Sequence, residues 1–318
     1  MNLQTNLTLT PAQAEPVLAA WLGCPVRCLG VERLRGGMIN SVLRLAFDRD
    51  PYTAVIKLNA AGEGFGEEAR QLRYLRAHSF PCPNVYLEGD AGAISQAPIS
   101  EVPLPYAFLL LETLPGVTLG DALLDPRDRV RVERELAEVL ADLHVHTRDT
   151  FGPIDAAGSE RWVDVFLPRL HAVRQEPDVE RRLPAWVLKE VDHAIDLAPS
   201  LLADQGEPTL IHGDIWSANV MVVQADDGWH LSGLVDPGAQ YADVEMELAY
   251  LRVFQTVGSG FFDIYTAYTP LRPGHELRWL VYWLRTYLVH VWLFGDQHYR
   301  DMTALVAREI VTDRRVER

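Results

Sequence analysis

The sequence is poor in the residues that build disulfide frameworks and secreted proteins. Only three cysteines, Cys24, Cys28 and Cys82, occur in 318 residues. An odd, low count does not predict a disulfide framework, so we expect a reducing compartment. Cys24 and Cys28 are four residues apart, but no His or Cys cluster accompanies them, which argues against a zinc site. The N-terminus shows no basic segment followed by a long apolar run, so the expected location is the cytoplasm.

Basic residues are also scarce. The chain has 29 Lys and Arg against 44 Asp and Glu, a formal net charge of −15. A general nucleic-acid binder needs a basic face, so no nucleic-acid partner is expected. The balance suits a cationic substrate such as an amine, although many proteins are simply acidic. The most apolar late stretch, Leu280 to Phe294, contains Arg285 and His290, so it predicts a buried helix and no membrane span.

The chain does have enough apolar residues, 48%, for a sizeable core in two lobes. Strand and helix patterns both occur, which predicts an α+β fold. Thr10-Pro11-Ala12-Gln13 predicts a capped helix that ends near Gly23. Strand-like runs follow, and helical periodicity dominates later. We therefore expect an N-terminal nucleotide-binding lobe over 1–111, a hinge over 112–116 and a helical C-terminal lobe over 117–318.

A glycine pair lies between two strand-like runs near the N-terminus. Gly36 and Gly37 could let backbone N–H groups approach phosphates closely. Taken alone, a Gly-Gly hairpin is more often structural. The side chains of Asn40 and Ser41, just after it, could also face the nucleotide.

Lys57 stands near the end of an apolar strand, and the next predicted helix starts near Gly66. Of the two acids in that helix, Glu68 is preferred to Glu67, because it shares a helix face with Leu72 and Leu75. A strand Lys paired with a helix Glu holds ATP phosphates in kinases. The competing interpretation is a solvated lysine at a strand end.

A fully apolar strand, 108–112, precedes the predicted hinge. Backbone groups of Glu112, Thr113 and Leu114 could hydrogen-bond an adenine edge. Such contacts depend little on side-chain identity, so the sequence supports them by position alone.

The strongest signal is the stretch from Leu210 to Val222. Asp214 is followed five residues later by Asn219, and Asp236 ends a further strand. Phosphoryl transfer from Mg-ATP needs such a set: one carboxylate orients the attacking hydroxyl, and the amide and second carboxylate bind Mg²⁺. His-Gly-Asp or Asp-Pro alone is usually a turn. Together with Lys57 and Glu68, the ordered set predicts an ATP-dependent phosphotransferase.

The same stretch resembles a known group of enzymes. His212-Gly213-Asp214-Ile215-Trp216-Ser217-Ala218-Asn219 is similar to the catalytic loop of the aminoglycoside-phosphotransferase-like kinases, and most similar to that of the fructosamine/ketosamine kinase family. The likeness extends over nearly the whole chain. The other segments that carry it are Gly36-Gly37 with Ile39-Asn40, Asp236-Pro237 with Tyr241, and the C-terminal run from Phe262 to Tyr299.

This resemblance implies a protein-kinase-like fold of two lobes with the ATP site in the cleft. It implies Asp214 as base, Asn219 and Asp236 as Mg²⁺ ligands, and Lys57 on the phosphates with Glu68 as its partner. The implied reaction phosphorylates a sugar hydroxyl of a ketosamine of the fructosamine or ribulosamine type, either a small molecule or a glycated protein side chain. Trp216 would then line the sugar pocket, with packing of the loop as an equal alternative.

The sequence departs from the family pattern after Tyr241. The segment Ala242-Asp243-Val244-Glu245-Met246-Glu247 stands where the family tends to have Gly-His-x-Glu-x-Asp, and Gly238 replaces the usual Ala. We place Asp243 and Glu245 on the acceptor side, where extra acid would favour a more cationic acceptor. The alternatives are a kinase for an aminoglycoside or amino alcohol, and a non-catalytic pseudokinase that serves as a binding module. The sequence predicts no oligomeric state.

Overall fold

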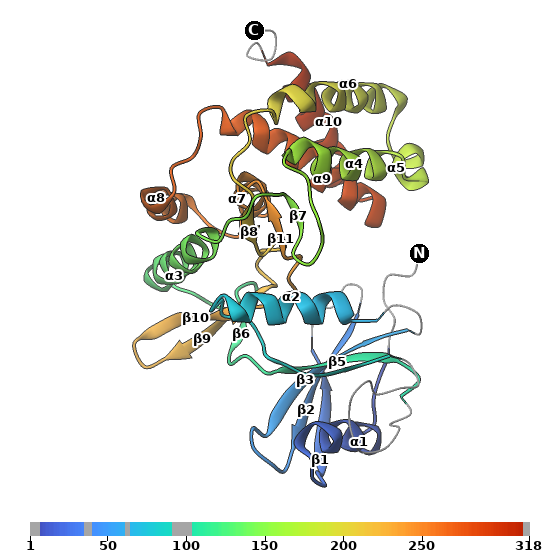
Figure 1. Cartoon of the computed structure of the whole chain (residues 1–318), viewed down its shortest axis with the longest axis vertical. Coiled ribbons are helices and arrows are strands. Elements are labelled where there is room, and N and C mark those ends of the chain that lie inside the picture. The colour runs from blue at the N-terminus through green and yellow to red at the C-terminus, as the bar shows by residue number, and fades with distance from the viewer. Residues whose placement is uncertain (1–6, 35–39, 61–63, 91–103, 314–318) are drawn as a thin grey trace. The chain divides into compact units, whose positions relative to one another are not determined.

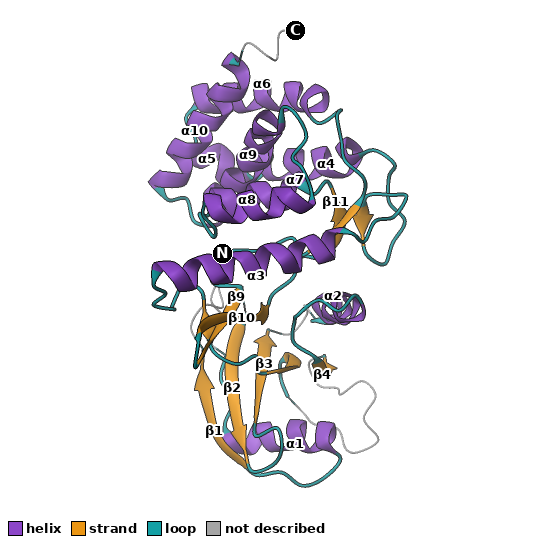
Figure 2. Cartoon of the chain, turned by 90° about the vertical axis from the view of Figure 1, so that its left-hand side faces the viewer, coloured by secondary structure: helices purple, strands orange, loops and turns teal. Residues whose placement is uncertain are grey.

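The computed structural model describes residues 7–34, 40–60, 64–90, 104–313. The chain divides into two compact units, which are described separately. The first comprises residues 1–123 and 218–237, and the second comprises residues 124–217 and 238–318. The first is built around β-strands and the second mainly from helices (Figure 2), as the predicted α+β class requires. No helix in the described ranges combines the length and apolar character needed to span a membrane.

The first unit begins with the predicted capped helix, α1 (Pro11–Leu22). The Thr10 hydroxyl accepts a hydrogen bond from the Gln13 N–H, and the Gln13 side chain accepts one from the Thr10 N–H, so the capping box is present. Gly23 ends the helix in the left-handed region at φ 70°. The helix prediction is therefore confirmed at both ends.

A five-stranded antiparallel sheet in the order β1-β2-β3-β5-β4 forms the body of this unit (Figure 1). Its strands are β1 (Cys28–Arg33), β2 (Ser41–Phe47), β3 (Thr53–Asn59), β4 (Val85–Gly89) and β5 (Ala107–Glu112). Helix α2 (Gly66–Ala77) follows β3 and contacts β4. The strand pattern near Lys57 and the helix start at Gly66 are confirmed.

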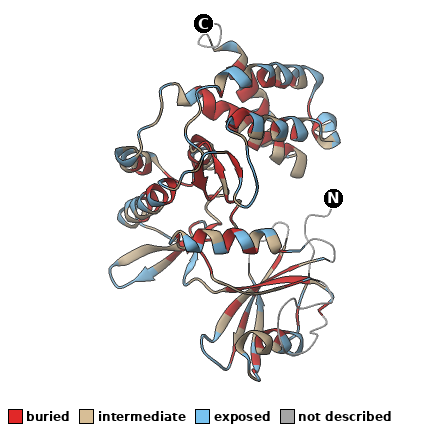
Figure 3. Cartoon of the chain, in the orientation of Figure 1, coloured by how far each residue is buried: buried red, intermediate tan, exposed pale blue. Residues whose placement is uncertain are grey.

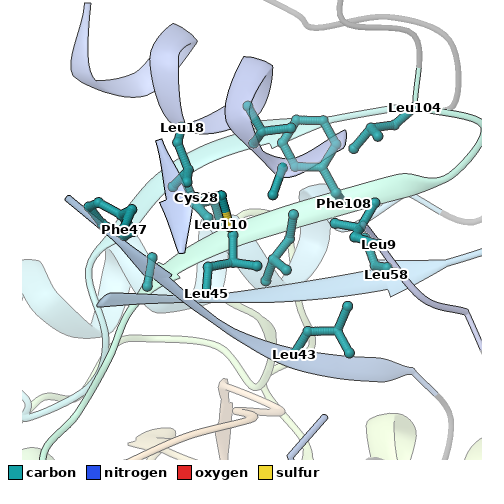
Figure 4. Close-up of a cluster of buried hydrophobic side chains, with 14 of the residues drawn as sticks. Leu9, Leu18, Cys28, Leu43, Leu45, Phe47, Leu58, Leu104, Phe108 and Leu110 are labelled. Atoms are coloured by element: carbon teal, nitrogen blue, oxygen red, sulfur yellow. The ribbon is translucent and has the colours of Figure 1, made fainter. Parts of the chain in front are cut away.

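Alternate residues of β2 and β3 point to opposite faces of this sheet, as strand geometry requires. One face packs against α1 in a closed apolar core (Figure 4). The opposite face carries polar and apolar side chains that line a cavity. The core set includes Leu18, Leu43, Leu45, Phe47, Ile56, Leu58, Phe108 and Leu110. The cavity set includes Val42, Arg44, Val55, Lys57 and Leu111.

Residues 218–237 belong to the first unit, although they are distant from it in sequence. They form β9 (Val220–Ala225) and β10 (Gly228–Leu234), which join β6 (Val117–Thr118) in a sheet of order β10-β9-β6. The Leu234 N–H donates to the Pro81 carbonyl at 2.8 Å. The predicted lobes were contiguous in sequence, with boundaries at 111 and 116. The compact units are not contiguous, because the β9–β10 hairpin pairs with β6 and so belongs to the first unit. The hinge over 112–116 stays a prediction.

The second unit is mainly helical and surrounds a small sheet of order β7-β11-β8. Helix α9 runs through its interior and is buried along most of its length (Figure 3). Helix α10 packs on α6 and α9, α7 packs on α9, and α3 packs on α8. The elements are α3 (Pro126–His144), β7 (Gly152–Pro153), α4 (Trp162–Arg174), α5 (Pro177–Arg182), α6 (Ala185–Leu201), β8 (Thr209–Ile211), β11 (Gln240–Ala242), α7 (Glu245–Val253), α8 (Ser259–Tyr268), α9 (His275–Leu293) and α10 (Gln297–Thr312).

Candidate active site

The first unit contains a cavity of about 410 Å³ on the sheet face opposite α1. Apolar side chains from strands of both its sheets line it, so a flat aromatic ring fits its chemistry better than a hydrated polar group does. Lys57, Glu68 and Asp236 line the same cavity. The apolar lining includes Val42, Val55, Leu111, Leu114, Met221 and Val235.

The three predicted hinge residues, Glu112, Thr113 and Leu114, also line this cavity. The Glu112 N–H already donates to the Asn84 carbonyl at 2.9 Å, and its carboxylate accepts from the Asn84 side chain at 2.6 Å. The Glu112 N–H is therefore already used within the protein, and the adenine contact expected at the hinge stays a prediction. The Thr113 Oγ1 is buried without a hydrogen-bond partner in the described chain.

Lys57 is the centre of a buried ion cluster at the cavity. Its side chain is only 6% exposed, and its Nζ lies 2.5 Å from Glu68 Oε1 and in hydrogen-bond contact with Asp236 Oδ1. Burial alone would lower the pKa of Lys57, but the charges of Asp236 and Glu68 outweigh it and hold that pKa above its usual value. Lys57 is therefore a fixed cation in the cavity wall. Its sequence-predicted partner was Glu68, and that pairing forms.

The choice between the two acids of α2 follows from helix geometry. Glu68 lies one turn before Leu72 on the buried side of α2, whereas Glu67 accepts a hydrogen bond from Gln71 at 3.3 Å. Burial raises the pKa of Glu68, and the nearby charge of Lys57 opposes that rise. Each of the two charges therefore stabilises the other in this buried position.

Asn219 and Asp236 supply oxygen donors at the same cavity. The Asp236 side chain is 42% exposed; Oδ1 bonds Lys57, and Oδ2 has no hydrogen bond among the residues described. Its backbone lies in the left-handed region at φ 56°, a conformation that holds the carboxylate at the strand end. The Asn219 carbonyl accepts the Val235 N–H at 3.0 Å, which ties the two segments together. An amide oxygen and a half-exposed carboxylate are hard donors of the kind that Mg²⁺ prefers, so this pair fits the ion.

The predictions for the glycine hairpin have separate outcomes. Gly36 and Gly37 lie outside the described residues and stay predictions. Asn40 is half-buried with an unpartnered Oδ1, but it does not line the cavity. Ser41 is 1% exposed and accepts the Leu7 N–H at 2.9 Å. The expectation that Ser41 faces the nucleotide is wrong in this structure, because the period of β2 places it on the core face.

Residues 212–217 of the predicted catalytic loop lie in the second unit and follow β8 directly. Gly213 adopts φ 86°, which favours glycine, and a β-carbon there would lie 2.3 Å from the Gly238 carbonyl oxygen. The Gly238 N–H donates to the His212 carbonyl at 2.8 Å. This close approach of two backbone segments fixes the path of the chain from β8 to Asp214. A β-carbon at Gly238 would meet nothing closer than 3.7 Å, so the position has room for the alanine that the family usually has.

Glu247 of α7 binds the backbone of the predicted catalytic loop. It is 1% exposed and accepts hydrogen bonds from the Gly213 N–H at 2.6 Å and the His212 N–H at 3.3 Å. His144 Nε2 lies 2.9 Å from the same carboxylate, and Tyr265 OH lies 2.7 Å from His144 Nδ1. Burial would raise the pKa of Glu247, but the hydrogen bond and charge of His144, with further help from His212 and Gly213, lower it. The catalytic loop is therefore held by an ionised, fully bonded carboxylate.

Asp214 has a direct partner on the next helix. The Tyr250 hydroxyl donates to Asp214 Oδ1 at 2.5 Å. Burial and the negative charge of Asp214 raise the pKa of Tyr250, so the phenol remains a donor at all ordinary pH values. This bond fixes one carboxylate oxygen of Asp214.

Asp243 and Glu245 are not free to act as predicted. Each is 1% exposed, and each carboxylate is engaged by arginine. Arg272 donates to both Asp243 oxygens at 2.8 and 2.7 Å, and Arg278 donates to both Glu245 oxygens at 2.5 and 2.9 Å. The two charges are thus neutralised inside the helical unit. Their placement on the acceptor side stays a prediction that this geometry does not support, and the expected extra negative charge for a cationic acceptor is absent here.

Aromatic side chains extend from Tyr250 along the neighbouring helices. Tyr250 contacts Phe254 in an edge-on arrangement at 4.7 Å between ring centroids, Phe254 contacts His290 at 5.2 Å, and His290 contacts Tyr299 at 4.6 Å. All four are half-buried. Trp216 is also half-buried, and its two predicted roles remain open.

Sequence reasoning missed Tyr250 and the anchoring role of Glu247. A tyrosine in an amphipathic helix gives no signal of its own, because core tyrosines have the same spacing. Glu247 was noted only as a departure from the family pattern. The available signal was a search for acids that could reach a buried histidine such as His144, which contacts Glu247 in the structure.

Comparisons with known proteins match the chain to one group. The family model for fructosamine kinase matches residues 12–312. A protein named probable ketoamine kinase from Staphylococcus aureus is 23% identical over 299 residues, covering 89% of this chain and 93% of that protein. A probable ketoamine kinase from Klebsiella aerogenes is 26% identical over 280 residues, covering 83% of this chain and 87% of that protein.

Solved structures give the same fold. A crystal structure assigned as a fructosamine-3-kinase from Haemophilus somnus has a TM-score of 0.71 at 21% identity and covers 94% of this chain and 96% of its own. An aminoglycoside phosphotransferase solved with ADP and hygromycin B has a TM-score of 0.66 at 20% identity and covers 94% of this chain and 98% of its own. The predicted kinase-like fold, with one β-rich and one helical unit, is confirmed.

Proposed function

The chain belongs to the fructosamine kinase family and is a phosphotransferase; on this premise we propose that it transfers the terminal phosphoryl group of Mg-ATP to a hydroxyl of a ketosamine. The observation that carries the proposal is the buried cluster of Lys57, Glu68 and Asp236 in the wall of an apolar cavity. A pseudokinase has no need to keep a buried lysine charged.

The cavity of the first unit binds ATP in this proposal. Its apolar strand residues contact the adenine ring, and free backbone groups near Thr113 and Leu114 contact the ring edge. The Lys57 ammonium binds phosphate oxygens, and Glu68 keeps that side chain extended through the ion pair. Asp236 would hold the metal and Lys57 would bind the phosphates; in the structure these two side chains contact each other.

Asn219 and Asp236 hold Mg²⁺ in this proposal. When bound, the ion neutralises charge on the phosphates and helps to align the transferred group. These two side chains would be the protein's oxygen donors to the ion. The half-exposed carboxylate of Asp236 supports this assignment.

Asp214 orients the acceptor hydroxyl and accepts its proton. A carboxylate of ordinary basicity suffices, because the proton leaves late in phosphoryl transfer. Tyr250 holds one oxygen of Asp214 and so fixes the orientation of its carboxylate. Glu247 holds the loop backbone on the N-terminal side of Asp214.

The acceptor is a ketosamine in this proposal, for which family membership is the main support. The half-buried rings beside Asp214 suit the C–H face of a sugar. The kinase solved with hygromycin B makes an aminoglycoside the competing acceptor, since it shares the fold.

The test is an assay of ADP release with purified protein, Mg-ATP and one acceptor at a time. The acceptors are a ribulose-linked amine, a fructose-linked amine, hygromycin B and an amino alcohol. We expect turnover of at least one ketosamine, a phosphorylated product by mass spectrometry, and none of either with Asp214→Asn. Turnover of hygromycin B without any ketosamine would reassign the acceptor. Nucleotide binding without turnover of any acceptor would favour a binding module.

A further inference from the structure

Two arginines in the helical unit lack the anion that a buried guanidinium needs. Arg169 on α4 and Arg285 on α9 are both half-buried. Arg169 Nη1 donates to the neutral Gln240 side chain at 2.5 Å. Arg285 Nε is shut off from solvent and has no hydrogen-bond partner. Within the described part of the chain, neither arginine lies within ion-pair distance of a carboxylate.

The two arginines lie on packed helices: α4 contacts α9, and Phe166 contacts Tyr282 at 5.1 Å between ring centroids, three residues before Arg169 and Arg285 respectively. Burial lowers the pKa of Arg169 and of Arg285, and the charge of Arg169 lowers the pKa of Arg285 further. By contrast, Arg174 and Arg278 of the same unit each have a carboxylate partner: Arg174 lies 2.7 Å from Asp192, and Arg278 lies 2.5 Å from Glu245. In a chain with 44 acidic residues, two neighbouring buried cations without a carboxylate stand out as a site that an external anion would complete.

The arginines lie on elements that pack around the predicted catalytic loop. The Arg169 partner, Gln240, stands opposite Ile211 in the β11–β8 pair, three residues before Asp214. Arg285 follows Trp283 on α9, whose indole N–H donates to the carbonyl of Ala249, the neighbour of Tyr250, and the Tyr250 hydroxyl donates to Asp214. An anion bound there would belong to a molecule whose reacting hydroxyl is near Asp214.

We propose that Arg169 and Arg285 form an anion subsite of the acceptor site, so that the preferred acceptor is a ketosamine that carries an oxyanion. This inference rests on the proposed function. A guanidinium presents planar paired donors that match a carboxylate or a phosphate. The oxyanion is either the carboxylate of an amino acid whose amine bears the sugar or a phosphate group on the sugar.

The buried acids of this unit agree with that assignment. Asp243 and Glu245 are neutralised by Arg272 and Arg278, so they leave no negative charge to attract a cationic acceptor. Arg169 and Arg285 remain as positive charges that have no carboxylate partner among the described residues. The preferred acceptor is thus an anion, although the chain itself has a net charge of −15.

The experiment compares matched acceptors that differ only in charge. Ribulose-linked glycine is compared with ribulose-linked glycinamide, and a ribulosamine 5-phosphate with its unphosphorylated form. The measured quantity is kcat/KM for wild type, Arg169→Met, Arg285→Met and the control Arg161→Met. Arg161 precedes α4, and its side chain is 69% exposed. Unfolding curves for each variant show whether the fold is kept.

We expect wild type and Arg161→Met to prefer one anionic acceptor over its neutral partner by about tenfold or more, which corresponds to one good charge contact. Arg169→Met and Arg285→Met should bring that ratio close to one, because they remove the charge contact that only the anionic acceptor makes. The pair that shows the preference identifies carboxylate or phosphate. Equal kcat/KM within both wild-type pairs would overturn the subsite. The subsite would also be overturned if kcat/KM fell equally for the charged and the neutral acceptor in Arg169→Met and Arg285→Met.

A separate measurement distinguishes failure of the proposed function from failure of the subsite. If no ketosamine is turned over, thermal unfolding is followed with inorganic phosphate or acetate against chloride at equal ionic strength. Stabilisation of wild type and Arg161→Met that is reduced in Arg285→Met would keep the anion site and reject the ketosamine. Equal stabilisation in all three would reject the anion site itself.

Discussion

Glu247 offers the sharpest test of how the catalytic loop is held. Its buried carboxylate accepts three hydrogen bonds, from the N–H groups of His212 and Gly213 and from His144. Glu247→Gln keeps the shape but replaces one oxygen by an NH₂ group that must face at least one of these donors. We expect the variant to lose stability and activity together, because the bonds position the residue just before Asp214.

The magnitude follows from the number of bonds affected. A hydrogen bond to a charged group contributes about 1.5–3 kcal/mol, and leaving a buried donor without an acceptor costs about 1–3 kcal/mol. The amide keeps part of the network if His144 changes tautomer, so the expected loss for Glu247→Gln is about 3 kcal/mol. Glu247→Ala leaves all three donors unpaired, and about 3–5 kcal/mol is expected. A shift of the loop by about 1 Å lowers kcat by about 100-fold.

The assay is urea unfolding at pH 7 together with kcat at a temperature where the variant stays folded. Glu138→Gln on α3 is the matched control, since its side chain is 48% exposed and 3.9 Å from Arg134. An exposed pair of this kind contributes about 0–1 kcal/mol, so the control should unfold near wild type. If Glu247→Gln unfolds at the same urea concentration as Glu138→Gln and keeps the wild-type kcat, Glu247 does not hold the loop.

The difference in unfolding free energy between wild type and Glu247→Gln should depend on pH in one direction. The fold lowers the pKa of Glu247, so its contribution is complete above the unfolded pKa and is lost as pH falls towards the folded one. An unfolded glutamate titrates near about 4.3. The gap in unfolding free energy between wild type and Glu247→Gln should therefore stay constant from pH 7 to about 5.5 and narrow below about 4.3. A gap that narrows between pH 7 and 6 would point to a different titrating group.

Three further predictions concern the site itself. Asp214→Asn should lower kcat by orders of magnitude while ATP still binds by calorimetry, and unchanged turnover would remove Asp214 from the base role. Asp236→Ala should weaken ATP binding with Mg²⁺ far more than binding without the metal; equal weakening in both would place Asp236 outside the metal site. Gly213→Ala should unfold at lower urea concentration and lose activity, because its β-carbon would lie 2.3 Å from a carbonyl oxygen, whereas Gly238→Ala should retain both. Equal behaviour of these two alanine variants would contradict the packing described for the loop.

The sequence predicted the first unit well because its signals are local. Thr10 and Gln13 form a capping box within one turn, and the strand that carries Lys57 has a simple apolar run. The choice of Glu68 over Glu67 needed only the helix period. Ser41 failed for an equally local reason: the alternation along β2 places it with Leu43 on the core face, and that alternation was not applied.

Other features could not be read in this way because they depend on contacts between distant segments. Residues 218–237 follow the catalytic loop in sequence, yet strand pairing with β6 and the bond from Leu234 to Pro81 put them in the first unit. Tyr250 becomes notable only when its hydroxyl reaches Asp214. Nothing in the sequence around it distinguishes it from a tyrosine of the core.

The acidic segment after Tyr241 shows why charge in a motif is a poor guide to substrate charge. Asp243 and Glu245 add negative charge to the sequence, but helix packing brings Arg272 and Arg278 onto them, so their field is largely cancelled. Arg169 and Arg285 belong to no motif, yet packing leaves them with a neutral amide and a phenol as neighbours. What an acceptor experiences is the charge that remains after pairing, because paired buried charges act as weak dipoles. In our proposal, residues of the loop motif therefore carry the chemistry, and the charge of the acceptor follows from which ions the surrounding helices leave unpaired.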